Sequence, residues 1–482
     1  MQFVIAIDIG TTSTKVLAVQ PDMIVRAQHQ VYYPTHFPQP GYAEQDAVEI
    51  LQAVLTGVET VVNRLPPTPL TVVLSSAMHS LLAVDKEGQA LSGIITWADT
   101  RSTQQARELQ ERGLAEELHR QTGTPIHPMS PLCKLMWLRQ HQPALFAQAF
   151  KFISIKEFIV FHLTGKFCVD YSIASATGLF DIHKLQWHSE ALNQAGISTE
   201  QLSDPVPITH RVPVVHSAFL RSTQLILGAS DGCLAQWGSN ALAPGKMTIT
   251  VGTSGAVRRM ATRAVFDAQG RLFNYILNDD VTITGGATNN GTAVLDWFAR
   301  ELADTSTPVS DWMEQVVKVP AGSEGLLALP FLQGERAPFY NPDARGVFFN
   351  VAMHHTRLHF AKALLESICY ELKWIAESVE DVCGPSETIL VSGGITHFPS
   401  WVQLLADVVN RSVIVSSQHD ASALGAARLA FQVLRVSVTA AEEQEKIFRP
   451  QAINAEVYQH GFQHFKRLYT AVAPYFSDSK RG

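Results

Sequence analysis

The sequence predicts an α/β protein of two related domains, and three observations lead to this fold class. The chain has 482 residues, which is more than one hydrophobic core usually organises. Short apolar runs typical of buried strands alternate with long helical patterns. A strand, a turn rich in glycine and threonine, and a second strand occur near the N-terminus and again after residue 246, which favours a duplicated architecture.

The composition is that of an ordinary globular protein, with 46% hydrophobic and 17% charged residues. The formal net charge of −7 argues against nucleic acid and against an anionic membrane surface as partners. A local basic pocket for a small anion is still compatible with this charge.

The targeting and redox features predict a cytoplasmic protein. The five cysteines are widely spaced and form no C-x-x-C pair, which favours reduced thiols over a disulfide framework. The N-terminal stretch lacks a basic region and is interrupted by Asp8, so we expect no signal peptide. No window approaches 18 uninterrupted apolar residues, so we expect no membrane span.

The first element is a hairpin of strands at 4–9 and 16–19, with the polar segment between them as its turn. Further strands of the same apolar character are expected at 70–77 and 387–394. The longest helix is expected over 360–379, where one apolar stripe recurs every three or four residues. The residues of this stripe are Phe360, Leu364, Ile368, Leu372, Ile375 and Val379.

The second hairpin is expected at 247–260, where Gly252-Thr253-Ser254 aligns with Gly10-Thr11-Thr12. The proline and glycine at 244 and 245 are typical of a linker, so the domains are expected at 1–242 and 243–482. A helical tail should end the second domain, and the charged stretch 442–449 is expected to be a solvated helix within it.

The two glycine- and threonine-rich turns suit a polyphosphate. Such turns present backbone N–H groups and hydroxyls toward one point, and facing turns could clamp a phosphate chain between the domains. Asp8, just before the first turn, could then hold Mg²⁺. Neither G-x-x-x-x-G-K-[ST] nor G-x-G-x-x-G occurs, which excludes the P-loop and dinucleotide fingerprints.

Beyond these patterns, the chain resembles the carbohydrate kinases of the FGGY family, in the superfamily of actin, hexokinase and sugar kinases. The segment "MSPLCKLMWL" (129–138) is similar to the family's first signature. The segment "HFAKALLESICYE" (359–371) is similar to the helical part of the second, although the spacer before it is longer than usual. Other matching segments, in family order, lie at 75–88, 95–102, 228–232, 331–346 and 421–430. The resemblance implies a duplicated actin-like (ribonuclease H-like) ATPase fold with a cleft between two domains, with ATP and Mg²⁺ as cofactors.

The resemblance also implies roles for individual residues in phosphoryl transfer. Asp231 of "GASDG" is expected to accept the proton of the attacking hydroxyl, and Asp8 and Asp231 are expected near Mg²⁺. Lys15 is expected to face solvent. The residues expected to bind the nucleotide and its phosphates are Thr11, Thr12, Thr253, Ser254, Gly286, Asn290, Gly393 and Gly394.

The acceptor contacts that the resemblance implies are Met78, His79, Trp97, Asp99, Arg101, Met129 and Asp231. Their segments are similar to those of gluconate-phosphorylating members, which implies conversion of D-gluconate to 6-phospho-D-gluconate. Xylulose or another pentulose is the alternative, because members acting on these sugars share the Met-His pair. Glycerol is disfavoured, because glycerol-phosphorylating members carry an Arg-Glu pair there. Arg101, Lys134 and Arg336 all stay open as partners for a substrate carboxylate.

A different class of function stays open as well. The actin-like fold also serves ATPases whose cycle drives conformational change rather than metabolite phosphorylation, although the segments at 75–88 and 129–138 argue against it. The expected partner is a small sugar acid or sugar, and the sequence leaves formation of a homodimer open.

Overall fold

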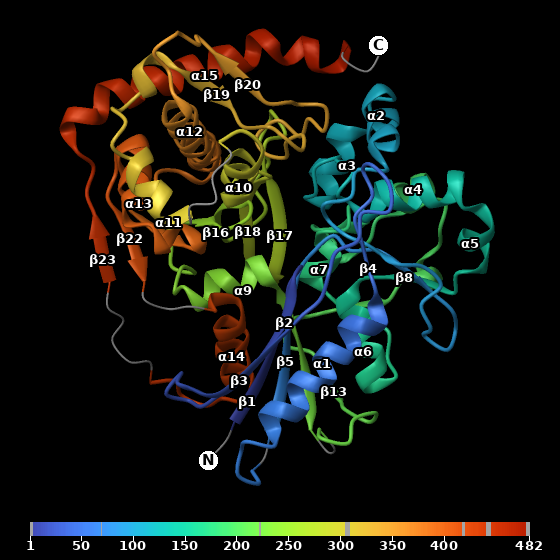
Figure 1. Ribbon diagram of the computed structural model, residues 1–482. Helices are drawn as coiled ribbons and strands as arrows, with labels where there is room; N and C mark the ends of the chain where they lie inside the picture. The colour runs from blue at the N-terminus through green and yellow to red at the C-terminus, as the bar shows by residue number, and fades with distance from the viewer. Residues whose placement is uncertain are drawn as a thin grey trace.

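The computed structural model describes residues 3–68, 70–220, 223–303, 309–416, 420–439 and 445–478. Two sheets form its framework (Figure 1). The first has the order β13 (Arg211–Pro213), β14 (Gln224–Ser230), β5 (Leu70–Ser76), β1 (Phe3–Ile9), β2 (Ser13–Val19) and β3 (Val25–Tyr32). The second has the order β17 (Phe273–Asn278), β18 (Val281–Thr288), β16 (Gly255–Ala261), β15 (Lys246–Val251), β21 (Thr388–Ser392), β22 (Val413–Ser416) and β23 (Glu445–Phe448).

The two sheets repeat one topology. In the first, β1 pairs antiparallel with β2 and parallel with β5, which in turn pairs parallel with β14. In the second, β15 pairs antiparallel with β16 and parallel with β21, which pairs parallel with β22. The expected α/β architecture with two related halves is therefore confirmed, and each half begins with the predicted hairpin.

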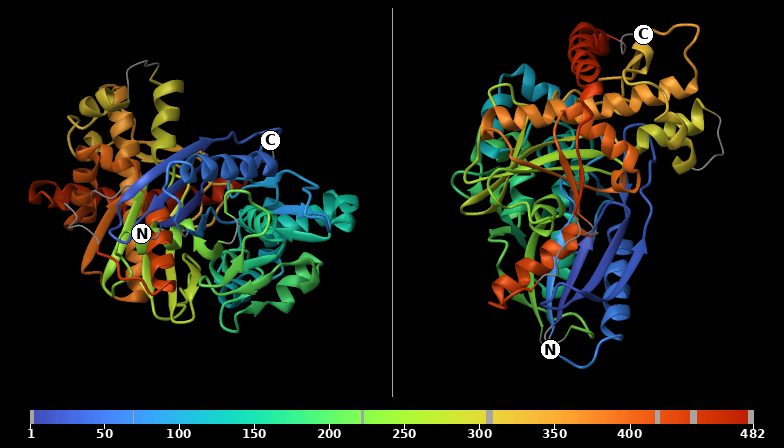
Figure 2. Two further views of the ribbon diagram at one scale, coloured as in Figure 1. Left: turned by 90° about the horizontal axis from the view of Figure 1, so that it is seen from below. Right: turned by 90° about the vertical axis from the view of Figure 1, so that its left-hand side faces the viewer.

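Helices cover both sheets. The larger ones are α1 (Ala47–Val62), α4 (Pro131–His141), α6 (Ile155–Thr164), α9 (Asp231–Gly238), α10 (Thr292–Glu301), α12 (Arg357–Cys383), α13 (Pro399–Val409), α14 (Ala421–Val433) and α15 (Ala452–Asp478). Shorter helices are α2 (Thr103–Glu111), α3 (Ala115–Thr122), α5 (Pro143–Gln148), α7 (Tyr171–Ser175), α8 (Ser189–Ala195) and α11 (Val309–Val316). Helix α15 runs along the end of the molecule opposite the N-terminus (Figures 1 and 2).

Small strands complete the loops of each half. They are β4 (Glu44–Gln45), β6 (Leu82–Val84), β7 (Ile94–Ile95), β8 (Lys151–Ile153), β9 (Cys168–Asp170), β10 (Phe180–Asp181), β11 (Gln186–Trp187), β12 (Asp204–Val206), β19 (Leu327–Leu329) and β20 (Val347–Phe349). Within the described parts of the chain, no helix is long and apolar enough to cross a membrane.

Each half has its own hydrophobic core. Helix α1 starts at Asp46, whose carboxylate accepts hydrogen bonds from the backbone N–H groups of Val48 and Glu49 and so caps the helix. Its apolar face packs on β2 and β3. In the second half, the predicted stripe lies on α12, where Leu364, Ile368, Leu372, Ile375 and Val379 are buried. The periodicity therefore identified the central helix of this core correctly.

Helices α9 and α14 cross between the two sheets with their backbones in contact (Figure 1). A Cβ atom at Gly238 would lie 1.8 Å from the carbonyl oxygen of Ala421, and one at Gly425 would lie 1.9 Å from that of Leu234. Such separations are impossible for real atoms, so this close crossing requires glycine at both positions. The pair places the first residue of α9 at the junction of the halves.

The charged stretch 442–449 is not the solvated helix that its composition suggested. Residues 442–444 lie outside the described residues, and Glu445–Phe448 form strand β23, which pairs antiparallel with β22. Phe448 is buried while the other three side chains of the strand are exposed. Pairing with the edge of the sheet therefore overrides the local helical preference.

Candidate active site

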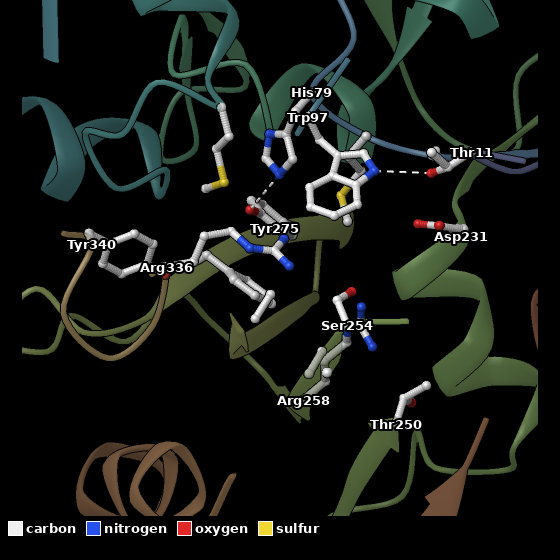
Figure 3. Close-up of a pocket in the computed structure, with 17 residues that line it drawn as sticks. Thr11, His79, Trp97, Asp231, Thr250, Ser254, Arg258, Tyr275, Arg336 and Tyr340 are labelled. Carbon is white, nitrogen blue, oxygen red and sulfur yellow. Dashed lines mark hydrogen bonds between the residues drawn. The ribbon is translucent and has the colours of Figure 1, made fainter. Parts of the chain in front are cut away.

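A cavity of about 180 Å³ is lined by residues of both halves. Figure 3 shows side chains from the first sheet and its loops facing side chains from the second hairpin and from the 331–346 segment. The lining residues are Thr11, Ala77, Met78, His79, Trp97, Met129, Asp231, Thr250, Ser254, Gly255, Ala256, Arg258, Phe273, Tyr275, Ala287, Arg336 and Tyr340. The structure therefore brings together seven of the predicted residues: Thr11, Met78, His79, Trp97, Met129, Asp231 and Ser254.

Asp231 is the carboxylate of this cavity (Figure 3). It is the first residue of α9, directly after β14, and its Oδ1 accepts a hydrogen bond of 2.6 Å from the N–H of Gly232. Burial raises the pKa of the Asp231 carboxyl to about 6, against the opposing charge of Arg258. A carboxyl with this pKa is ionised at neutral pH and still basic enough to take a proton from a reacting hydroxyl.

Asp8 lies close enough that its charge also raises the pKa of Asp231. Ser75 donates a hydrogen bond of 2.6 Å to Asp8 Oδ1, and Ser422 donates one of 3.2 Å to Oδ2. Burial raises the pKa of Asp8, whereas these two hydroxyls lower it. Two neighbouring carboxylates supply the hard oxygen ligands that a divalent cation prefers, so the residues present fit Mg²⁺.

The two predicted hairpins close in similar ways. The N–H of Gly10 donates to the carbonyl of Ser13 at 2.9 Å, and the N–H of Gly252 donates to the carbonyl of Ser254 at 2.8 Å. Trp97 Nε1 donates to Thr11 Oγ1 at 3.0 Å, which ties the indole to the first turn (Figure 3).

Two residues of the first hairpin, Thr12 and Lys15, do not line the cavity. Thr12 is exposed and is not among the residues that line the cavity. Lys15 does not simply face solvent, because its ammonium forms an ion pair with Asp420 next to α14. This ion pair joins the first hairpin to the segment that leads into α14.

A second cavity of about 390 Å³ begins beside the second hairpin. Its lining includes Thr253, whose neighbour Ser254 lines the first cavity, so adjacent residues of one turn serve both spaces. Its other lining residues are Asn289, Asn290, Ala293, Val294, Asp296, Trp297, Arg300, Leu332 and Gln333. This continuous arrangement suits a nucleotide in the second cavity with its phosphates directed at the first.

Besides Thr253 and Ser254, the second half holds four predicted nucleotide contacts, and the structure places them differently from one another: Gly286, Asn290, Gly393 and Gly394. Gly393, at φ +90°, packs against the second hairpin, because its Cβ would lie 2.5 Å from the Val251 carbonyl oxygen. Gly394 lies beside it, with Gly252 Cα at 3.9 Å from the position of its Cβ. Both therefore allow close approach of backbone at this turn.

Asn290 lines the second cavity, but its amide nitrogen is committed to Thr288, Glu335 and Glu371 in the protein interior. Gly286 lies inside β18, where a Cβ would collide with Ala337 and Ile375, and it lines neither cavity. The structure thus leaves Gly286 in the core, since strand β18 turns that position toward α12.

His79 is held rigidly at the cavity wall. Its backbone adopts φ +66°, its Nδ1 donates to the Ala176 carbonyl oxygen at 2.7 Å, and the Tyr275 hydroxyl donates to its Nε2 at 3.2 Å. Burial lowers the pKa of His79 to about 3, so the ring is neutral at physiological pH. The bond to Tyr275 crosses the cavity between the two halves (Figure 3).

Asp99 and Arg101 do not line the cavity, contrary to the expectation that they contact the acceptor. The Asp99 carboxylate is buried and accepts hydrogen bonds from the N–H of Ala43 and from the Arg101 guanidinium. Arg101 also pairs with Glu44 and stacks on Tyr42 at 3.7 Å. Their charges are satisfied by each other and by Glu44, so this cluster has a structural role outside the cavity.

Lys134 is another internal support. Its ammonium is fully buried and donates hydrogen bonds to the carbonyl oxygens of His79, Ile95 and Thr96. Burial lowers the pKa of Lys134 to about 7. The side chain joins the segment of His79 to the one before Trp97, and it does not reach the cavity.

Several lining residues are not among the predicted site residues, and those with the largest side chains are Arg258, Phe273, Tyr275 and Tyr340. Arg258 lies two positions beyond Ala256 on β16, so the alternation of that strand turns both toward the cavity. This alternation along the strand that follows the second hairpin could have predicted that Arg258 faces the site. Phe273, Tyr275 and Tyr340 arrive from distant segments and carry no comparable local pattern.

Comparisons with known proteins agree with the fold. The family model for the N-terminal domain of the FGGY family of carbohydrate kinases matches residues 3–235, and that for the C-terminal domain matches 247–433. The chain is 37% identical to a gluconokinase of Bacillus subtilis over 441 residues, covering 88% of this chain and 86% of that protein. It is 29% identical to a xylulose kinase of the same species, covering 98% and 97%.

Solved structures show the same relationship over the whole chain. The crystal structure of gluconate kinase from Lactobacillus acidophilus matches with a TM-score of 0.92 at 31% identity and covers 99% of both chains. A ligand-bound xylulose kinase from the same species matches with a TM-score of 0.92 at 30% identity and covers 99% of this chain and 100% of its own. The resemblance noted in the sequence is confirmed: this chain belongs to the FGGY family of carbohydrate kinases.

Proposed function

We propose that the protein phosphorylates D-gluconate with ATP to give 6-phospho-D-gluconate. The observation that carries the proposal is the position of Asp231. Its carboxyl has a pKa of about 6 and lies in a cavity bordered by both glycine- and threonine-rich hairpins. The identity of 37% to a gluconokinase, against 29% to a xylulose kinase, supports gluconate as the acceptor.

In the proposed reaction, Asp231 accepts the proton of the acceptor's terminal hydroxyl as that oxygen attacks the γ-phosphorus of ATP. The new O–P bond forms while the bond from the γ-phosphorus to the β,γ-bridging oxygen breaks, and ADP leaves with that oxygen. Arg258, beside Asp231, keeps the carboxylate ionised in a buried setting. Its positive charge also lies where negative charge builds up on the transferring group.

The hairpins position the donor in this proposal. The turns at Thr11 and Ser254 flank the cavity, and Thr253 begins the second cavity, where the nucleoside would lie. Asp8 and Asp231 would hold Mg²⁺, which when bound neutralises phosphate charge. His79, fixed by Ala176, accepts the hydrogen bond of the Tyr275 hydroxyl, whose oxygen can in turn accept a hydrogen bond from a hydroxyl of the acceptor.

A xylulose kinase is the second candidate, favoured by the TM-score of 0.92 to the ligand-bound enzyme of Lactobacillus acidophilus. An assay of ADP release at fixed ATP and Mg²⁺ separates the two, with D-gluconate, D-xylulose, D-ribulose and glycerol as acceptors. We expect kcat/KM for gluconate to exceed that for each neutral acceptor by about 100-fold or more, because unmatched polar groups penalise an analogue heavily.

ATP without any acceptor is the control in this assay. If xylulose or ribulose gives the higher kcat/KM, gluconate is not the substrate although the family assignment stands. If ADP release is equally fast without acceptor, the protein is an actin-like ATPase rather than a metabolite kinase.

A further inference from the structure

The cavity contains a buried guanidinium, that of Arg336, which forms no ion pair with an acidic side chain among the described residues. The sequence left Arg101, Lys134 and Arg336 open as partners of a substrate carboxylate, and only Arg336 lines the cavity. Arg101 is paired with Asp99 and Glu44, and Lys134 is saturated by three carbonyl oxygens. Arg336 therefore stands apart from the other two in facing the space where an acceptor would bind.

The Arg336 side chain is fixed, yet it is incompletely satisfied. The residue is 8% exposed, one terminal nitrogen donates to the Thr288 carbonyl oxygen at 2.7 Å, and the guanidinium stacks on Trp97 at 4.7 Å. Its buried Nε–H has no hydrogen-bond partner, and no carboxylate of the described chain lies within 4.0 Å of the guanidinium. The neighbouring Glu335 carboxylate is occupied by backbone N–H groups and by Asn290.

Burial opposes the charge of Arg336, although the neighbouring Glu335 carboxylate favours it, and the unpaired buried Nε–H adds to the cost. An anionic ligand group at this position would relieve both.

A second unsatisfied donor lies at the same end of the cavity. Tyr340 is also 8% exposed and lines the cavity, and its buried hydroxyl has no hydrogen-bond partner. The two residues are fixed relative to each other, because the N–H of Tyr340 donates to the Arg336 carbonyl oxygen at 2.5 Å. Buried donors are almost always satisfied in folded proteins, so the unsatisfied Arg336 Nε–H and Tyr340 hydroxyl, which lie close together, indicate a missing acceptor group.

The position of this end relative to Asp231 selects the ligand. In Figure 3, Asp231, Arg258, Ser254 and Thr250 lie on one side of the cavity, and Arg336 and Tyr340 lie on the other. The Arg336 guanidinium extends from that side to the middle of the view, beside Tyr275 and Trp97. A linear acceptor with a hydroxyl at Asp231 would thus present its opposite terminus to Arg336 and Tyr340.

Arg258 does not compete for this role. A Cβ atom at Gly232 would lie 2.9 Å from Arg258 Nε, which places this guanidinium beside the first turn of α9 and next to the base. Its Nε–H is also buried without a partner, and its charge lowers the pKa of the Asp231 carboxyl. Arg258 therefore belongs to the phosphoryl-transfer end.

We infer that Arg336 and Tyr340 form the receptor for the acceptor's carboxylate, with the guanidinium and the phenol as its donors. This inference rests on the proposed function, since it assumes a sugar acid with its terminal hydroxyl at Asp231. The two residues fix which end of the acid reaches the base. They also exclude neutral sugars, which would leave the Arg336 charge buried and unpaired.

The test compares D-gluconate with D-glucitol, which has the same carbon chain but a neutral hydroxymethyl group in place of the carboxylate. Arg336→Gln should lower kcat/KM for gluconate by about 100-fold, the scale of a lost charge-assisted hydrogen bond, mainly through KM. Its low activity on glucitol should change by less than about threefold. Arg345→Gln, an exposed arginine in the same segment, is the matched control and should leave both acceptors unaffected.

Tyr340→Phe keeps the test decisive if Arg336→Gln fails to fold. It removes only a hydroxyl that has no partner, so thermal stability should be unchanged or higher while calorimetric affinity for gluconate without ATP falls about tenfold. If both variants lower gluconate and glucitol activity equally, or if Arg258→Gln alone abolishes the preference for gluconate, the inference is overturned. If the wild-type enzyme itself prefers a neutral pentulose, the proposed function fails instead.

Discussion

Replacing Asp231 by asparagine should have opposite effects on catalysis and on stability. The amide keeps the shape of the side chain and can still accept the 2.6 Å hydrogen bond from the N–H of Gly232. It cannot accept the proton of an attacking hydroxyl, so kcat should fall by about 10²–10⁴-fold. Binding of ATP and of the acceptor should change by only a few fold, since the site keeps its form.

The stability gain follows from the pKa of Asp231. Burial raises it from 3.8 to about 6, so the folded protein disfavours the ionised carboxylate by about 2 pKa units, or roughly 3 kcal/mol. The residue is partly exposed, and screening reduces this to roughly 1–2 kcal/mol. Because the folded pKa lies above the unfolded one, the penalty is fully present above pH 6 and disappears as the pH falls toward 3.8. The substitution Asp231→Asn should therefore stabilise the protein at pH 8 but not at about pH 4.

Two measurements on the same preparations check this. Initial rates of ADP release give kcat, and urea unfolding at about pH 8 and about pH 4 gives the change in free energy of unfolding. A kcat within tenfold of wild type would remove Asp231 from proton transfer. If the asparagine variant is less stable than wild type at the higher pH, burial does not make the ionised Asp231 carboxylate unfavourable.

Two further predictions concern the surroundings of Asp231. Below pH 6, kcat/KM should fall about tenfold per pH unit, because the base must be ionised, and Arg258→Gln should move this acid limb to higher pH by about one unit. Rate profiles from about pH 5 to 9 check this, and an acid limb that stays in place would refute the role of Arg258. Gly425→Ala should destabilise the protein by about 1–3 kcal/mol and lower kcat, because its Cβ would lie 1.9 Å from the Leu234 carbonyl oxygen. Urea unfolding checks it against the exposed Gln432→Ala on the same helix, and equal stability of the two variants would contradict the close helix crossing.

Local chemistry was the part of this protein that its sequence predicted well. The turns at Gly10 and Gly252 depend on residues a few positions apart, and the stripe on α12 depends on a repeat within one helix. Local sequence was not enough to identify Asp231, because Asp-Gly is a common turn; only the resemblance to a family indicated its role. The structure places it in the cavity beside Asp8, as that resemblance implied.

Long-range packing explains what the sequence could not provide. Arg258 and Tyr340 both belong to the second half, and they meet at one cavity only because distant segments of that half pack together; nothing near either residue in the chain encodes this. The resemblance gave Asp99 and Arg101 a position but not their partners, and the structure uses each to neutralise the other. Strand β23 likewise forms because the edge of β22 needs a partner, against the helical preference of its own residues.

The crossing of α9 and α14 at Gly238 and Gly425 has a consequence for how such an enzyme can change in evolution. Asp231 stands on one helix of this pair, and Ser422, which holds Asp8, stands on the other. The side chains of Arg336 and Tyr340, by contrast, come from the 331–346 segment, outside both helices. Acceptor preference can therefore drift through loop substitutions while the transfer machinery stays fixed. A library that varies the loops and spares the two glycines should yield many folded kinases with altered acceptors.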